Sequence, residues 1–219
     1  MTIHKDCADH LRQFVSAAGA TLRAGHAHEL VAAFFGYGTG AALRAESSYS
    51  IAQLSEADIL IPDAETLHQR TQDMPELPDE ARDVDSVVTA LCDFLRTQGH
   101  FSGEVWRTED LAEYVKDDYL PTHHMLTIMD ELAGEMAETN ASFDGPDFDE
   151  ATIESDEDGV KVTVTGVLEG DTDLDRPFSG DKIDFTCEVA FDRVAGRVAF
   201  RRPDVSAGGS VDDSYYDGD

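Results

Sequence analysis

The spacing of apolar residues changes near Asn140, and this change limits the folds that the chain can adopt. Before residue 140, apolar residues recur every three or four positions, as in the stretch 84–95, VDSVVTALCDFL; this spacing is typical of one face of an α-helix. Beyond it, valines alternate with polar residues from Val160 to Val164, and Asp158-Gly159 is a hairpin-turn signal. The sequence therefore predicts an α+β protein whose C-terminal part is an antiparallel β-sheet of about four strands.

The same patterns divide the chain into five segments. Helices expected over 5–18, 24–35 and 39–46, joined by tight turns, make residues 1–46 a small helix-turn-helix-like module. Residues 47–83 read as a connector with one short helix over 64–72, and 84–139 as central helices, two of them beginning at Thr108 and Thr122. Residues 140–203 are the expected β domain, and 204–219, with five Asp and no basic residue, the expected acidic flexible tail.

Charge is unevenly distributed along the chain. The net charge is −30, yet residues 1–45 hold four basic and three acidic residues, so the other 174 carry −31. An acidic body repels nucleic acid and anionic membranes and attracts basic proteins. Adaptation to molar salt is the rival explanation of the acidity. Such adaptation should make the whole surface acidic, whereas the first 45 residues carry no excess of acidic residues.

Cysteine usage and hydropathy predict a cytoplasmic protein. Cys7, Cys92 and Cys187 lie far apart and form no CxxC pair, so we expect buried thiols rather than disulfides or a zinc site. The sequence contains no apolar run long enough to span a bilayer, and its first residues lack the pattern of a secretory signal.

Two stretches contain residue types that bind metals. His26 and Glu29 are three residues apart and can share a helix face, whereas His28 points elsewhere; an HExxH arrangement is absent. Asp171, Asp173 and Asp175 match the first ligand positions of a calcium loop, but Arg176 and Lys182 occupy positions that such a loop gives to Gly and Glu. The adjacent His123 and His124 diverge on a helix. We therefore expect no metal and no cofactor.

Residues able to contact a partner gather in and beside the same acidic loop. The stretch 176–184, RPFSGDKID, sets Arg176 and Phe178 beside the three aspartates, and Trp106 is the single tryptophan of the chain. An exposed aromatic side chain can anchor a protein partner. The sequence thus offers a partner-binding set made of Asp171, Asp173, Asp175, Arg176, Phe178 and Trp106.

Residues 11–46 resemble a short helical module near the N-terminus of many uncharacterised proteins of bacterial plasmids and integrative elements, which carries the label glyoxalase-related. The likeness lies in Leu11, Leu22 to Ala27, Glu29 to Ala32, Gly36-Tyr37 and Ala42-Leu43. Gly38-Thr39-Gly40 stand where the usual pattern has an acidic residue or Ser and an aromatic. The resemblance implies a bacterial mobile-element origin and a helix-turn-helix-like fold. It implies no glyoxalase activity, because glyoxalases take their metal ligands from β-strands.

Three functions follow as hypotheses. The first is a non-enzymatic interaction protein whose acidic body binds a basic partner, such as a nucleic-acid-binding or host-defence protein, by imitating DNA. The second is a DNA-binding regulator or antitoxin-like protein that reads DNA through residues 1–46 as a homodimer. The third is a metal-dependent enzyme whose ligands come from distant segments. The sequence shows no phosphate loop, no GxSxG and no nucleophile with a base, which favours the first.

Overall fold

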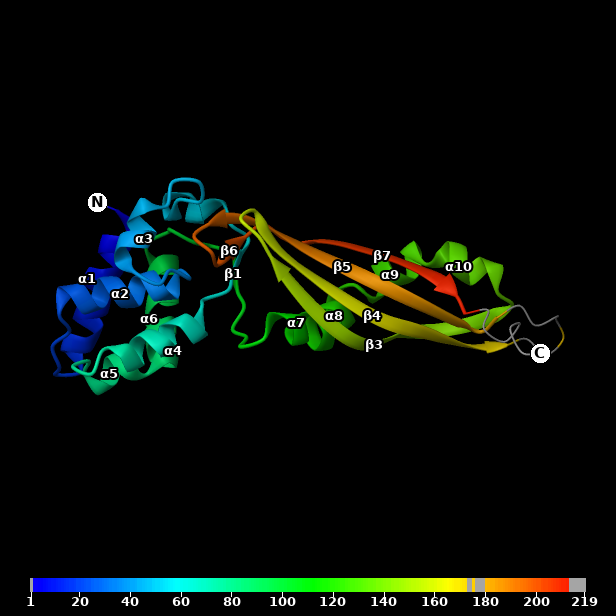
Figure 1. Ribbon diagram of the computed structural model, residues 1–219, viewed down its shortest axis with the longest axis horizontal. Helices are drawn as coiled ribbons and strands as arrows, with labels where there is room; N and C mark the ends of the chain where they lie inside the picture. Colours follow the sequence, from blue (N-terminus) through cyan, green and yellow to red (C-terminus); the bar gives the residue numbers. More distant parts are fainter. Residues whose placement is uncertain (1, 173–174, 176–179, 213–219) are drawn as a thin grey trace. The chain divides into compact units, whose positions relative to one another are not determined.

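The computed structural model of the protein describes residues 2–172, 175 and 180–212 (Figure 1). The chain forms two compact units. Unit 1 comprises residues 1–109 and 192–202, and unit 2 comprises residues 110–191 and 203–219. These boundaries differ from the five expected segments, because the first 46 residues belong to a larger helical unit and do not stand as a module of their own.

Unit 1 is built around one buried helix, α2 (Ala24–Phe34). Leu30, Val31 and Phe34 are completely buried, as are the alanines between them. Such a helix, apolar on almost every side, is stable only inside a protein. Its neighbours are α1 (Ile3–Ala17), α3 (Gly40–Ala45) and α4 (Ala64–Asp73).

The rest of unit 1 completes this core. The segment expected to be a connector contributes Leu54, Leu60 and Leu67, each fully buried, and is therefore part of the core. Helix α6 packs on α1, α4 and α5. The remaining elements of the unit are the 3-10 helix η1 (Ile51–Glu56), β1 (Ile59–Leu60), α5 (Asp79–Arg82), α6 (Val84–Thr97), β2 (Glu104–Val105), the end of β5 and β6 (Ala199–Phe200).

Glycine is required where α2 ends. Gly36 has φ +82°, and the next residue, Tyr37, donates its backbone N–H to the carbonyl of Ala32 at 2.9 Å. This is the Schellman arrangement that closes many helices. A Cβ on Gly36 would lie 2.8 Å from Cβ of Arg197, so the turn after β5 packs directly against the helix end.

Unit 2 begins with a layer of short helices. They are α7 (Leu111–Tyr114), the π-helical turn η2 (Val115–Tyr119), α8 (Leu120–His123), α9 (Met125–Glu131) and α10 (Ala133–Glu138). The first helix is capped by Asp110 and not by Thr108, because the Asp110 carboxylate accepts from the N–H groups of Ala112 and Glu113. Thr122 lies inside α8 and begins no helix.

The expectation of about four antiparallel strands is wrong. The described residues contain a mixed sheet of seven strands in the order β2-β1-β6-β5-β4-β3, with β7 beside β5. Here β3 is Ala141–Ser155, β4 is Gly159–Thr172, β5 is Lys182–Ala195 and β7 is Asp204–Val211. Strands β1 and β2 are parallel. The strands that the sequence pattern missed in unit 1, β1 and β2, have two residues each and are too short to show an alternation.

The segment from residue 204 on was expected to be a tail, yet its first part forms strand β7 (Asp204–Val211), paired antiparallel with β5. Ser, Ala and Gly occupy its centre, and these residues have low β-propensity. The strand forms because residues 205, 207, 209 and 211 face the interior of unit 2, so pairing and burial outweigh propensity.

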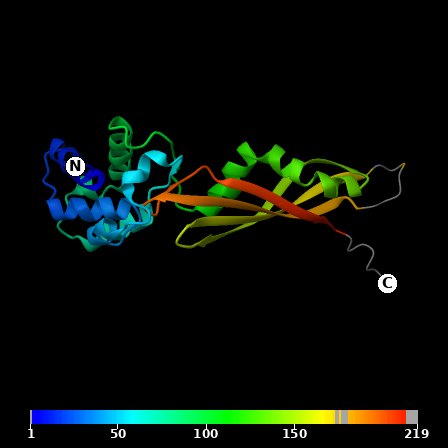
Figure 2. The same ribbon diagram turned by 90° about the horizontal axis from the view of Figure 1, so that it is seen from above.

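The long strands of unit 2 are β3 (Ala141–Ser155), β4 (Gly159–Thr172) and β5 (Lys182–Ala195), with β7 at their side. The hairpin expected at Asp158-Gly159 joins the first two. Helices of the unit cover one face of these strands (Figures 1 and 2). The buried side chains on that face include Val162, Val164, Leu168, Ile183, Phe185, Cys187 and Val189, opposite Val115, Leu120, Ile128 and Leu132 of the helices.

Candidate functional site

The other face of the unit 2 strands is open to solvent. In β5, burial alternates residue by residue, so that Ile183, Phe185 and Cys187 point inward while Asp184 and Thr186 are exposed. Because paired residues of antiparallel strands share a face, Ser210 and Gly208 of β7 lie on the open side with them. No helix of unit 2 lies on this side in Figure 2. The open face is thus an extended polar surface.

Most of the protein's negative charge belongs to unit 2. Its 99 residues include 28 acidic and 4 basic residues, a net charge of −24, whereas the 120 residues of unit 1 include 18 acidic and 12 basic residues, a net charge of −6. The division by charge therefore follows the two units rather than a boundary at residue 45. Potentials around such a dense set of carboxylates draw in cationic groups.

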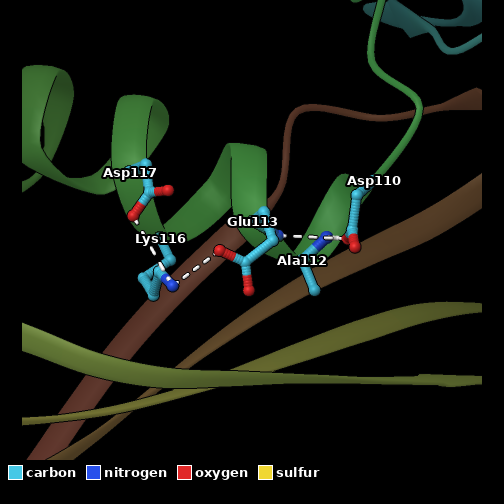
Figure 3. A network of polar contacts seen from close by, with 5 residues as sticks. All are labelled: Asp110, Ala112, Glu113, Lys116 and Asp117. Atoms are coloured by element: carbon cyan, nitrogen blue, oxygen red, sulfur yellow. Dashed lines mark hydrogen bonds and ion pairs between the residues drawn. The ribbon is translucent and has the colours of Figure 1, made fainter.

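The lysines of unit 2 do not relieve this charge, because each lies against carboxylates. On the helical layer, Lys116 Nζ lies 2.6 Å from Glu113 and 3.7 Å from Asp117 (Figure 3). The hydrogen bond that Lys116 donates to the Glu113 carboxylate raises the pKa of Lys116. On the sheet, Lys161 lies 3.4 Å from Glu188 and Lys182 lies 3.1 Å from Asp184.

An open trench of about 570 Å³ crosses the four long strands on the open face. Its exposed side chains come from every strand: Asp149 of β3, Thr165 of β4, Asp184 and Thr186 of β5, and Ser210 of β7. A bulge in β3 sets two residues, Asp149 and Glu150, opposite Thr165, and both are exposed. The trench is lined by Asp149, Thr165, Gly166, Val167, Asp184, Phe185, Thr186, Gly208, Gly209 and Ser210.

Sequence reasoning did not find this trench. The alternation in 183–189 was a usable signal, since it sets Asp184, Thr186 and Glu188 opposite to an apolar face. Asp149 gave a weaker signal, because Asp147 and Asp149 alternate with Phe148 only briefly before the bulge at Asp149 and Glu150 ends the alternation. The site also depends on β7, which lacks a strand-like sequence.

The predicted acidic loop is only partly described. Asp171 is exposed near the end of β4, paired with Ser142, and Asp175 is exposed as well. Asp173, Arg176 and Phe178 lie outside the described residues. The trench and Asp171 share the open side of β4, since Asp171, Val167 and Thr165 are an even number of residues apart along one strand.

Trp106 is not the exposed anchor that was predicted. Its side chain is 6% exposed, and its indole Nε1 lies 3.3 Å from the Glu104 carboxylate. Its backbone N–H donates to the carbonyl of Leu60 at 3.0 Å. Trp106 therefore contributes to the fold of unit 1 and offers no surface to a partner.

The histidine and glutamate at the start of α2 do not converge on a metal site. Both carboxylate oxygens of Glu29 accept from the backbone N–H of Gly40 at 3.2 Å, so this side chain holds the start of α3. The His28 ring instead faces His4, with 5.8 Å between the ring centroids. Across the described ranges, no group of three or more His, Cys, Asp or Glu side chains is arranged to hold a metal ion.

The side chains of the adjacent His123 and His124 have different surroundings, as expected for neighbouring residues of a helix. His123 is exposed, while His124 Nε2 lies 2.9 Å from the hydroxyl of the buried Tyr119. A π-helical turn, here ending at Tyr119, often marks a functional position. In this protein the residues around it support the sheet from the covered side.

Unit 1 has a groove of its own, of about 660 Å³, between α1 and α6. The His10 ring stacks on Phe94 with 4.5 Å between centroids, and Phe14 lines the groove beside them. Burial lowers the pKa of His10. The groove combines two phenylalanines with the carboxylates of Asp85 and Asp93, and its side chains belong to no group of three or more that could hold a metal ion among the described residues.

Comparison of the chain with protein-family models, with curated proteins and with solved structures finds no match. The arrangement of its own residues is therefore the basis for assigning a function. Within the described part of the chain, none of the helices has both the length and the apolar character needed to cross a bilayer.

Proposed function

We propose that this is a non-enzymatic interaction protein whose acidic unit 2 binds a basic protein. The observation that carries the proposal is the concentration of 28 carboxylates against 4 cations in this unit, beside a unit of nearly balanced charge. Adaptation to high salt would acidify both units alike. A charge confined to one unit is what recognition of a cationic partner requires.

A partner that normally binds DNA fits this chemistry best. Duplex DNA is a dense, regular array of negative charge, and proteins bind it through lysines and arginines. We propose that unit 2 occupies such a surface as a DNA mimic and blocks a nucleic-acid-binding or host-defence protein, in the cytoplasm of a bacterium that carries a mobile element such as a plasmid.

The alternative of a DNA-reading regulator has less support from residues 1–46. Helix α2 is buried among other helices and cannot enter a groove, and α3 has six residues. Two of the segment's four cations are already engaged, since Arg12 pairs with Asp9 and Arg23 pairs with Glu76. Few positive charges remain to contact phosphates.

The test is capture of partners by the immobilised protein from bacterial lysate, at about 50 mM and about 500 mM salt. We expect basic, nucleic-acid-binding proteins to be retained at low salt, released at high salt, and displaced by added duplex DNA. Retention of no basic protein at low salt would contradict the proposal. Retention that duplex DNA does not disturb would contradict the DNA-mimic part alone.

A further inference from the structure

The trench on the open face of unit 2 has features of a recognition site that the net charge alone does not require. It crosses all four long strands, so its shape depends on the whole sheet and not on one loop. Its exposed side chains are small or acidic, and its lining contains no lysine or arginine. At the edge of the trench Lys182 lies 3.1 Å from Asp184 in a solvent-exposed ion pair. A docking cation therefore exchanges with this one lysine at Asp184, because exposed ion pairs contribute little, and meets no lysine or arginine of the lining itself.

The floor of the trench is shaped by small residues. Gly208 is exposed, and a Cβ placed on it would have no heavy atom within 4 Å. The hydroxyls of Thr165, Thr186 and Ser210 surround this gap. Hydroxyl groups both donate and accept hydrogen bonds, so the floor can bind the backbone and polar side chains of an incoming chain.

Carboxylates stand on both sides of that floor. Asp149 belongs to β3 and Asp184 to β5, with β4 between them, so they are separated by two strand spacings, about 10 Å. Arg guanidinium groups bind carboxylates through two parallel hydrogen bonds. Two cations at this separation can thus be held at once, one on each side of the hydroxyl floor.

We propose that the trench binds an arginine-bearing segment of the basic partner, with one cation at Asp149 and another at Asp184. This inference rests on the proposed function and assigns it a site. The surroundings favour a cationic segment: on the same face Asp147, paired with Val167, adds further negative charge, whereas Glu188 is engaged by Lys161 at 3.4 Å. A second copy of unit 2, at −24, and a nucleic acid are both repelled.

The experiment measures binding of the full-length protein to a fluorescent nona-arginine peptide at about 50 mM salt, followed by anisotropy. The trench variant is Asp149→Asn/Asp184→Asn. Its matched control is Asp118→Asn/Asp130→Asn, which removes the same charge from exposed positions on the helical layer of the same unit. We expect the trench variant to weaken binding at least tenfold and the control less than twofold.

A second pair of variants blocks the trench without changing charge. Gly208→Phe fills the floor, and Gly134→Phe places the same side chain on α10, where a Cβ also has open space. We expect only Gly208→Phe to lose peptide binding. Circular dichroism and the thermal midpoint establish that each variant is folded, and the two pairs remain informative independently of each other.

The outcomes separate the two proposals. If the wild-type protein does not bind nona-arginine, the proposed function itself is overturned. If it binds, but trench and control variants weaken binding equally, the attraction is diffuse; the function stands and the trench assignment falls. If spermine binds with the same dependence on Asp149 and Asp184 while nona-arginine does not, the occupant is a small polycation and the assignment of a protein segment is overturned.

Discussion

Both carboxylate oxygens of Glu29 accept the backbone N–H of Gly40 at 3.2 Å, which ties α2 to the start of α3. Glu29→Ala removes this contact and leaves a partly buried N–H without its acceptor, so we expect a loss of about 1–2 kcal/mol in the free energy of unfolding. Denaturant unfolding measures it. His26→Ala, in the same turn of α2, is the control and should cost less than about 0.5 kcal/mol. Equal losses would contradict the structural role of Glu29.

Gly36 combines a positive φ with a close neighbour, whereas Gly99 has a positive φ of +71° and open space around it. An Ala side chain at either position pays for the left-handed backbone, about 1–2 kcal/mol. At Gly36 it must also displace Arg197, whose Cβ would lie 2.8 Å away. We expect Gly36→Ala to destabilise more than Gly99→Ala by at least about 1 kcal/mol in thermal or denaturant unfolding. A smaller or reversed difference in stability between the two variants would mean that the turn at Arg197 moves aside without a loss of stability.

Arg82 binds a whole loop. Its guanidinium donates to the carbonyls of Thr71, Met74, Pro75 and Leu77 at 2.8–3.2 Å. Arg82→Ala leaves these carbonyls to water and should cost about 2 kcal/mol.

A suitable control for that variant is Arg96→Ala, since Arg96 is exposed and donates to the carbonyl of Gly103 at 3.1 Å. We expect this change to cost less than about 1 kcal/mol. Limited proteolysis should cut Arg82→Ala between residues 71 and 78 sooner than the control. Similar unfolding midpoints for the two variants would show that the loop does not depend on Arg82.

Histidines of unit 1 should make stability fall on mild acidification. Burial is the main cause that lowers the pKa of His4 and of His10 below the ordinary value of 6.5. For His4, the neighbouring His28 and Arg44 lower the pKa further, while Asp6 opposes them. Between the folded-state pKa and 6.5, the unfolded chain binds more protons, so this contribution to stability is complete above pH 6.5 and is lost as the pH falls below it.

The measurement is the thermal midpoint from pH 7.5 to 5.5 for the wild type and for His4→Gln/His10→Gln. Carboxylates change both proteins alike, so the difference between them isolates the histidines. We expect the wild type to lose stability relative to the variant as the pH is lowered. A constant difference across this range would refute the assignment.

The three cysteines should be unreactive in the native protein. All are buried thiols, as the sequence predicted, and burial raises the pKa of Cys7 to about 12, of Cys92 to about 11 and of Cys187 to about 12. Since the thiolate is the reactive form, a disulfide reagent at pH 8 should label none of them within minutes and all three after unfolding. Rapid labelling of one cysteine in the native state would show that its surroundings open.

How far the sequence predicted the structure depends on the length of each element. Helices with several turns, such as α1, α2 and α6, and the hairpin at Asp158-Gly159 were predicted close to their observed bounds, because each repeats its pattern several times. Strands of two residues are too short to show an alternation of apolar and polar residues. The alternation in β7 is weak, because its small residues pack only when they are paired with β5.

The site was less accessible to sequence reasoning than the fold. Net charge indicated a cationic partner, but the position of the charge on one sheet face follows from strand pairing between segments as distant as Asp149 and Ser210. Trp106 looked like a surface anchor because a side chain's burial is decided by tertiary neighbours such as Leu60. The spacing around Glu29 argued against a metal ligand, but its role as acceptor for the start of α3 was not predictable, because Gly40 lies eleven residues further along the chain.

Strand β5 belongs to unit 2 up to Phe191 and to unit 1 from Asp192, so the polypeptide passes between the units three times, at 109/110, 191/192 and 202/203. Neither unit is formed by one continuous stretch of the chain. A gene fragment that encodes residues 1–109 lacks Val198 and Ala199, which belong to the core of unit 1. Unit 2 therefore cannot be moved to another chain as one continuous fragment without residues 192–202, and a fragment that includes them takes Val198 and Ala199 from the core of unit 1.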